Sequence, residues 1–305
     1  MIPDVNTAVR LRAVTKTFGS TAAVTDLDLD VPTGSLCGFI GPNGAGKTTT
    51  IRMIMAIQFP DSGELEVLGC RRALDAKDRL GYLPEDRGLY RKMKVGAFLR
   101  FMGHLKSVPS GDLDRRVTYW LERVELAGVA DKKCEELSKG MQQKVQFIQT
   151  LLHDPDILIL DEPMSGLDPV GTNVMRDAMI ELSRAGKTLI VSSHQMATVE
   201  QMCDRVVLIN KGHKVLDGRV AEIKASYGKN TLVLAFEGDG SFLKTLPGVA
   251  SVNDHGRYAE LRLGPGADAQ AILRAASDKL KITKFEVVEP SLHDIFIERV
   301  TEVPA

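Results

Sequence analysis

Short apolar runs alternate with helix-like stretches up to about residue 216. A stretch at residues 48–57 has helical periodicity, and residues 93–152 form a longer one that a Pro-Ser-Gly triplet at 109–111 breaks once. Such alternation predicts an α/β layer structure with a mostly parallel sheet, interrupted by a helical insertion at about residues 92–152. The runs typical of strands are residues 9–14, 35–40, 157–160, 188–192 and 205–210.

The pattern changes after Gly218. Residues 224–230 predict a linker, and the chain beyond it follows the order β-α-β-β-α-β, which is typical of the ferredoxin-like fold. The expected elements are a strand at 232–236, a short helix at 241–246, a hairpin of 249–253 and 258–263, a helix at 268–280, a strand at 282–288 and a last helix at 291–300. The expected domains are therefore residues 1–226 and a small α+β domain at residues 227–305.

Charge and apolar content exclude several classes of protein. Lys and Arg number 39 and Asp and Glu number 40 among 305 residues, so the net charge is −1. An even balance gives no support to a basic nucleic-acid-binding surface, and no nucleic-acid partner is expected. No apolar run approaches the ~20 residues that cross a bilayer, and the first residues lack the apolar segment of a secretory signal.

Cysteine and histidine spacing gives no sign of a metal site. The cysteines lie far apart without a CxxC pair, which predicts buried thiols of a cytosolic protein. The six histidines form neither HxxH nor HExxH, so an imidazole metal site is not expected. The cysteines are Cys37, Cys70, Cys134 and Cys203.

Residues 41–48 read Gly-Pro-Asn-Gly-Ala-Gly-Lys-Thr and fit the P-loop pattern G-x-x-x-x-G-K-[ST]. They follow a predicted strand and open a predicted helix, so backbone N–H groups and the helix N-terminus can face phosphate oxygens. Lys47 is expected to reach the β- and γ-phosphates, and Thr48 to bind Mg²⁺. The expected nucleotide-binding residues here are Gly41, Pro42, Asn43, Gly44, Ala45, Gly46, Lys47, Thr48 and Thr49.

A pair of acidic residues ends the apolar run at 157–160. Asp161 is placed to hold Mg²⁺ through its water shell, and Glu162 to orient and activate the attacking water. An Asp after four apolar residues is weak by itself, but the pair downstream of a P-loop is a stronger signal. Three further features make a simple solvated turn an improbable explanation of the acidic pair: a helix start that Ser138 can cap, a loop at 165–169 and a strand end at 192–194.

Over about residues 9–220 these motifs resemble the ATP-binding subunits of ATP-binding-cassette (ABC) transporters. The resemblance implies a P-loop NTPase cassette that binds ATP and Mg²⁺ and hydrolyses ATP. It also implies that His194 touches the γ-phosphate and that Phe18 stacks on adenine, although a core position for Phe18 is the alternative. The signature motif that contacts a nucleotide on the opposite subunit would be Leu137, Ser138, Lys139, Gly140 and Met141, and the D-loop linking the two sites would be Ser165, Gly166, Leu167 and Asp168.

The chain departs from the family pattern at two places. Lys139 and Met141 stand where the signature usually has Gly and Gln. Glu85 stands where the family usually has a Gln that contacts Mg²⁺ and reports to the membrane partner, so a changed metal affinity or coupling is expected. Residues 84–90 and 290–296 resemble the subgroup that serves sodium-efflux and drug-efflux exporters.

One chain carries one copy of each motif, so a signature that acts in trans requires a second ATP-binding subunit. We expect a head-to-tail dimer, most simply a homodimer, that docks on a separate transmembrane permease at the inner face of the cell membrane. Residues 85–101 are the expected dock, although core positions for Phe98, Phe101 and Met102 are the alternative. A cassette protein acting on ribosomes or DNA is the competing class. The C-terminal domain either senses a ligand or extends the dimer interface.

Overall fold

The computed structural model describes residues 7–86, 88–228 and 230–302. The chain divides into two compact units, one up to Gly218 and one from Arg219 onward. The sequence placed this division near residue 226. Residues 220–227 form helix α7 (Val220–Tyr227), so the linker expected over 224–230 is helical for its first half.

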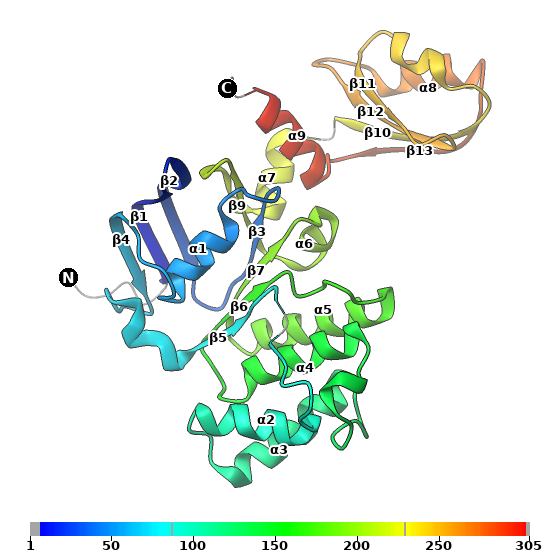
Figure 1. Ribbon diagram of the computed structural model, residues 1–305. Helices are drawn as coiled ribbons and strands as arrows, with labels where there is room; N and C mark the ends of the chain where they lie inside the picture. The colour runs from blue at the N-terminus through cyan, green and yellow to red at the C-terminus, as the bar shows by residue number, and fades with distance from the viewer. Residues whose placement is uncertain (1–6, 87, 229, 303–305) are drawn as a thin grey trace. The chain divides into compact units, whose positions relative to one another are not determined.

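The first unit carries the longer series of elements (Figure 1). Its strands are β1 (Thr7–Phe18), β2 (Thr21–Pro32), β3 (Leu36–Ile40), β4 (Ser62–Val67), β5 (Leu80–Leu83), β6 (Ile157–Asp161), β7 (Thr188–Ser193), β8 (Arg205–Asn210) and β9 (His213–Arg219). Its helices are α1 (Lys47–Ile54), α2 (Val95–Leu105), α3 (Ser110–Arg123), α4 (Lys139–Leu151), α5 (Pro169–Arg184) and α6 (Met196–Met202), with 3₁₀ turns η1 (Ala73–Arg79) and η2 (Cys134–Glu136).

The central sheet has the order β5-β6-β7-β3-β8-β9, and neighbouring strands from β5 to β8 pair in parallel. Every residue of β3 and β6 is buried, as expected for parallel strands covered on both faces. The mostly parallel α/β prediction is therefore confirmed. The strand β6 ends on Asp161 because the apolar run stops there.

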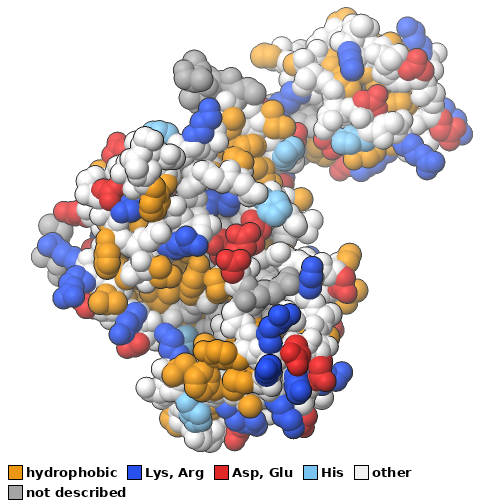
Figure 2. Space-filling model, in the orientation of Figure 1, with side chains coloured by type: hydrophobic (Ala, Val, Ile, Leu, Met, Phe, Trp, Pro, Cys, Tyr) orange, Lys and Arg blue, Asp and Glu red, His pale blue; other side chains and the backbone are white. Residues whose placement is uncertain are grey.

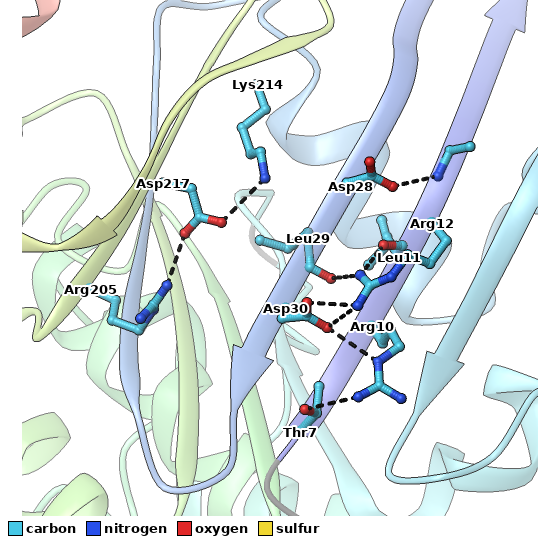
Figure 3. Close-up of polar contacts among 11 residues, drawn as sticks. Thr7, Arg10, Leu11, Arg12, Asp28, Leu29, Asp30, Arg205, Lys214 and Asp217 are labelled. Carbon is cyan, nitrogen blue, oxygen red and sulfur yellow. Dashed lines mark hydrogen bonds and ion pairs between the residues drawn. The ribbon is translucent and has the colours of Figure 1, made fainter. Parts of the chain in front are cut away.

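A second, antiparallel sheet has the order β2-β1-β4 and was foreseen from the sequence only in the run at 9–14. Charged pairs cross its outer surface (Figure 3): Arg10 Nε lies 3.2 Å from Asp30 Oδ1, and Arg12 Nη2 lies 2.7 Å from Asp30 Oδ2. Such half-exposed pairs contribute at most about 1 kcal/mol each, so the apolar side of the sheet dominates its stability. Asp217 similarly joins Arg205 and Lys214 at 3.2 and 3.3 Å.

The helical insertion is broken twice, not once. The first break lies before Ser110, and Ser110 and Gly111 already belong to α3. The second break runs from Val124 to Ser138, where Glu125 and Gly128 have positive φ angles that end a right-handed helix. Helix α1 also ends earlier than residue 57, because Ala56 adopts φ 54°.

The second unit forms a four-stranded antiparallel sheet of order β11-β12-β10-β13. Leu232, Leu234 and Phe236 point into its core, as their alternation predicted. This is the arrangement of the split βαβ prediction, with a 3₁₀ turn in place of the first helix. Besides α7, its elements are β10 (Thr231–Glu237), η3 (Ser241–Thr245), β11 (Val249–Asp254), β12 (Tyr258–Leu263), α8 (Ala269–Ser277), β13 (Lys281–Val288) and α9 (Leu292–Glu302).

Within the described ranges, no helix is long and apolar enough to cross a membrane. The cysteines are free thiols: Cys37, Cys134 and Cys203 are buried, as expected, but Cys70 is only half-buried. Burial raises the pKa of Cys37 to about 12, which leaves it protonated and unreactive.

Helix α6 packs so closely on β3 that only glycine fits at position 38. A Cβ at Gly38 would lie 2.3 Å from Val199 Cγ1. We predict that Gly38→Ala lowers the free energy of unfolding by about 1–3 kcal/mol through overpacking, measured by urea denaturation. Gly111→Ala in α3 is the matched control, because its Cβ would meet nothing within 4 Å and should be neutral or stabilising. Equal stability of the two variants would contradict the prediction.

Candidate functional site

The loop between β3 and α1 wraps around the start of the helix. Gly41 and Gly46 have φ angles of 153° and 108°, in the region that favours glycine. A Cβ at Gly41 would lie 2.1 Å from the Ile209 carbonyl oxygen, and one at Gly46 would lie 2.5 Å from the Ala23 carbonyl oxygen. Two glycines are thus required by the tight course of the backbone, and residues 43–49 of the loop and the helix start line one hollow.

Lys47 begins α1 and is 7% exposed. Its ammonium group donates to the carbonyl oxygens of Gly41 at 2.7 Å and Pro42 at 3.1 Å. Burial lowers its pKa below the ordinary value, and the carboxylates of Glu162, Asp161 and Glu85 oppose that shift. The side chain is therefore a desolvated cation that can exchange two neutral acceptors for phosphate oxygens.

Asp161 joins three elements at the carboxyl end of β6. Thr48 Oγ1 donates to Asp161 Oδ2 at 3.2 Å, and Ser192 Oγ of β7 donates to Asp161 Oδ1. The aspartate is 1% exposed, so both contacts stabilise the buried carboxylate. The arrangement brings the hydroxyl and the carboxylate that were expected to share Mg²⁺ within hydrogen-bond distance.

Glu162 has a left-handed backbone with φ 49°. Its N–H lies 3.2 Å from the Ser192 carbonyl oxygen and 3.1 Å from Ser192 Oγ, contacts that hold this uncommon conformation. Its Oε1 accepts from the His194 backbone N–H at 3.0 Å and lies 2.9 Å from His194 Nδ1. The carboxylate expected to activate water is thus oriented by the residue expected to touch the γ-phosphate.

These groups line a hollow of about 490 Å³. Glu85, on the segment after β5, reaches its wall, so the Gln-to-Glu departure adds a third carboxylate to the site. Gly41 and Pro42 do not line it and act instead through their carbonyl groups on Lys47. The lining residues are Ala23, Asn43, Gly44, Ala45, Gly46, Lys47, Thr48, Thr49, Glu85, Asp161, Glu162 and His194.

The oxygen donors of the hollow fit Mg²⁺. Thr48, Asp161 and Glu85 supply a hydroxyl and two carboxylates, the hard ligands that this cation prefers. Among the described residues, no group of three or more His, Cys, Asp or Glu could hold a metal. A cation here would therefore share its coordination between these side chains, water and phosphate oxygens, as Mg²⁺ does with nucleotides.

The signature and D-loop residues lie against each other and line no part of this hollow. Ser138 caps α4 by accepting from the Met141 N–H at 3.2 Å, as predicted, and Asp168 caps α5 by accepting from the Gly171 N–H at 2.6 Å. A Cβ at Gly140 would lie 3.2 Å from the Gly166 carbonyl oxygen, so the two segments touch. Leu137 is buried, whereas Ser138 and Lys139 are exposed.

Phe18 ends β1 with 47% of its surface exposed, which excludes the core position. Its ring lies 5.6 Å from Lys16 Nζ and does not line the hollow. An exposed aromatic ring on the nucleotide-binding unit remains available for stacking on a base.

Two contributors to the site were not identified from the sequence. Ser192 was noted only as a strand end, yet it contacts both acidic residues. Gln143 of α4 is 1% exposed and its Nε2 donates to the carbonyl oxygens of Glu162 at 3.4 Å and Pro163 at 3.2 Å. A glutamine inside an apolar helix face was the available signal.

Two sequence families match separate parts of the chain. Residues 24–165 match the family described as ABC transporter, and residues 218–300 match the family described as ATP-binding protein DrrA1-3-like, C-terminal domain. A shorter match at residues 133–200, described as AAA domain, putative AbiEii toxin, Type IV TA system, overlaps the first.

Relatives extend the likeness across both units. The chain is 42% identical over 290 residues to "Uncharacterized ABC transporter ATP-binding protein YhaQ" of Bacillus subtilis, which covers 95% of this chain and 97% of that protein. The chain belongs to the ABC transporter ATP-binding proteins. This ABC protein is also 30% identical to linearmycin resistance ATP-binding protein LnrL of Bacillus subtilis, over 93% of the chain and 95% of that protein.

A third relative of this ABC protein, Nod factor export ATP-binding protein I of Cupriavidus pinatubonensis, is 35% identical over 72% of the chain and 68% of that protein. A solved structure described as the ATP binding subunit of an ABC transporter superposes with a TM-score of 0.67 at 28% identity, covering 73% of this chain and 94% of the other. The ABC ATP-binding protein is therefore an ATPase with the cassette fold predicted from its motifs.

Lys47 gives the first test of the hollow as the ATP site. We predict that Lys47→Ala weakens ATP binding at least tenfold, because the variant loses the cation nearest the expected phosphate positions. Fluorescent-nucleotide titration measures the affinity, and Lys132→Ala, an exposed lysine outside the hollow, is the control. Wild-type affinity in Lys47→Ala would contradict the assignment of the hollow.

Proposed function

We propose that this ABC ATP-binding protein powers export of an ion or small molecule through a separate membrane subunit. In this proposal two copies pair head to tail and enclose two ATP molecules. The supporting observation is that residues 137–141 and 165–168 line no part of their own chain's hollow. A second copy would bring these segments to the exposed side of a nucleotide bound there, and the contact between Gly140 and Gly166 would move them together.

Within each site, the side chains divide the work of hydrolysis. Lys47 and the loop N–H groups bind and orient the triphosphate. Glu162 holds the attacking water and accepts its proton, while the His194 N–H fixes the orientation of that carboxylate. Thr48, Asp161 and Glu85 would hold Mg²⁺, which when bound neutralises charge on the β- and γ-phosphate oxygens.

An exposed aromatic surface is the proposed dock for the membrane subunit. Tyr90 is 53% exposed and packs edge-on against Phe98 and Phe101, with ring centroids 6.0 and 5.8 Å apart. Phe98 is buried, whereas Phe101 and Leu105 are 40% and 64% exposed, so the expected patch is partly core and partly surface. Figure 2 shows apolar side chains gathered over the region of α2. The chain would then lie peripherally on the inner face of the membrane.

The proposed direction of transport, export, is supported by the names of similar proteins. Names of similar proteins refer to Nod factor export and to linearmycin resistance. The C-terminal unit matches a domain found in the DrrA1-3-like group of ATP-binding proteins. We propose that this unit extends the dimer interface, with ligand sensing as the alternative.

Glu162 tests the dimer and the chemistry together. We predict that Glu162→Gln binds ATP with Mg²⁺ but hydrolyses it at least about 100-fold more slowly than the wild type, since the amide cannot accept the water's proton. Light scattering of the variant should show a shift from monomer to dimer on adding ATP. Glu64→Gln, at an exposed position of β4 outside the hollow, is the control for turnover. Near-normal turnover in Glu162→Gln, or a monomer with ATP bound, would contradict the proposal.

Glu85 tests the link to the membrane subunit. We predict that Glu85→Gln keeps ATP hydrolysis in the isolated chain, because Glu162 and Lys47 remain in place. In the complex with the membrane subunit it should change the number of ATP molecules hydrolysed per molecule transported. The measurement compares transport and ATPase rates in the same vesicles. An unchanged ratio would remove any role of this glutamate in coupling.

A further inference from the structure

Helix α4 carries two buried amide side chains on one face. Gln143 and Gln146 are 1% and 0% exposed, and a spacing of three residues places them one turn apart on the same side of the helix. Burial of an amide is unfavourable unless its polar atoms are bonded, so their contacts explain why they face inward.

Each amide contacts the backbone of a different loop of the nucleotide hollow. Gln143 Nε2 donates to the carbonyl oxygens of Glu162 and Pro163, directly after β6. Gln146 Nε2 lies 3.4 Å from the carbonyl oxygen of Asp86, the residue after Glu85. Both carboxylate-bearing loops of the site are therefore held by the helix that begins with the signature motif.

The Gln146 contact is incompletely made. Its 3.4 Å length is at the long end for a hydrogen bond. Its Oε1 is buried without a hydrogen-bond partner among the described residues. An apolar side chain would fill this helix position without leaving an orphaned acceptor, so packing alone does not account for a glutamine here.

We propose that Gln146 is a positioning residue that sets where Glu85 stands in the metal site. It acts through the Asp86 backbone and touches neither metal nor nucleotide. The inference rests on the proposed function, in which Glu85 helps to hold Mg²⁺. Through this contact the signature helix holds the Asp86 backbone, next to Glu85 in the wall of the hollow.

The test is Gln146→Met, which keeps the length of the side chain and removes both polar groups. Gln149→Met is the matched control, because Gln149 lies on the same helix, also has a buried unpartnered Oε1 and does not line the hollow. Both variants are made in full-length Glu162→Gln protein, so that ATP is bound and not consumed. Affinity for ATP is measured in EDTA, and affinity for Mn²⁺ in the presence of ATP is measured by electron paramagnetic resonance.

The expected result is a Mn²⁺ affinity about tenfold weaker in Gln146→Met, with ATP affinity in EDTA unchanged and Gln149→Met equal to its parent. In the active chain, kcat at saturating Mg²⁺ should stay near the wild-type value, as predicted for Glu85→Gln, while the Mg²⁺ concentration for half-maximal hydrolysis rises about tenfold. Adding Glu85→Gln should produce little further loss of Mn²⁺ affinity, because both changes act on the same ligand. Circular dichroism and thermal unfolding confirm that the variants are folded.

Three outcomes would overturn the inference: equal Mn²⁺ affinities in Gln146→Met and Gln149→Met, losses from Gln146→Met and Glu85→Gln that multiply, or no change in Glu85→Gln alone. None of these outcomes changes ATP binding in EDTA, so none contradicts the assignment of the hollow as the ATP site. Absence of ATP binding in the parent protein would instead remove the proposed function itself, and the inference with it.

Discussion

The parallel pairing of β6, β7 and β3 is the constraint on which the site depends. Ile40 of β3 pairs with Ser193 of β7, and Ser192 pairs with Asp161 of β6, so the three strands end at nearly the same level. In an open parallel sheet, ligands bind beyond these carboxyl ends. Residues separated by more than 140 positions thereby meet in one hollow, and the strands can hold them because each is buried on both faces.

The parts of the fold that the sequence predicted well are those with a local signal. Apolar runs marked β3, β6, β7 and β8, and the glycine-lysine pattern marked the phosphate loop. The antiparallel sheet was mostly missed although β2 alternates: Leu27, Leu29 and Val31 are buried, and Asp28 and Asp30 between them are not. Such alternation indicates a half-buried strand, but it does not show which strands pair. Contacts to Glu162 from Ser192 and Gln143 depend on tertiary packing, which no local pattern encodes.

The departures from the usual signature fall where the structure makes least demand on the side chain. Ser138 keeps the hydroxyl that caps α4, and Gly140 keeps the space beside the Gly166 carbonyl oxygen. Lys139 is an exposed first-turn position, where a longer side chain disturbs neither contact. A cation there would add attraction for a phosphate group approaching from a second copy, beyond that of the helix N-terminus.

Helix α4 links the signature motif to two loops of this chain's own nucleotide hollow. Its 13 residues span about 20 Å, its exposed N-terminus carries the signature, and its buried face holds the loops of Glu162 and Glu85. Gln143 and Gln146 lie four and seven residues after Lys139, so a displacement of the helix N-terminus would also move the side chains that contact these loops. In the proposed dimer, nucleotide bound by a second copy at this N-terminus would thus displace the loops that carry Glu162 and Glu85, through the side chains of Gln143 and Gln146.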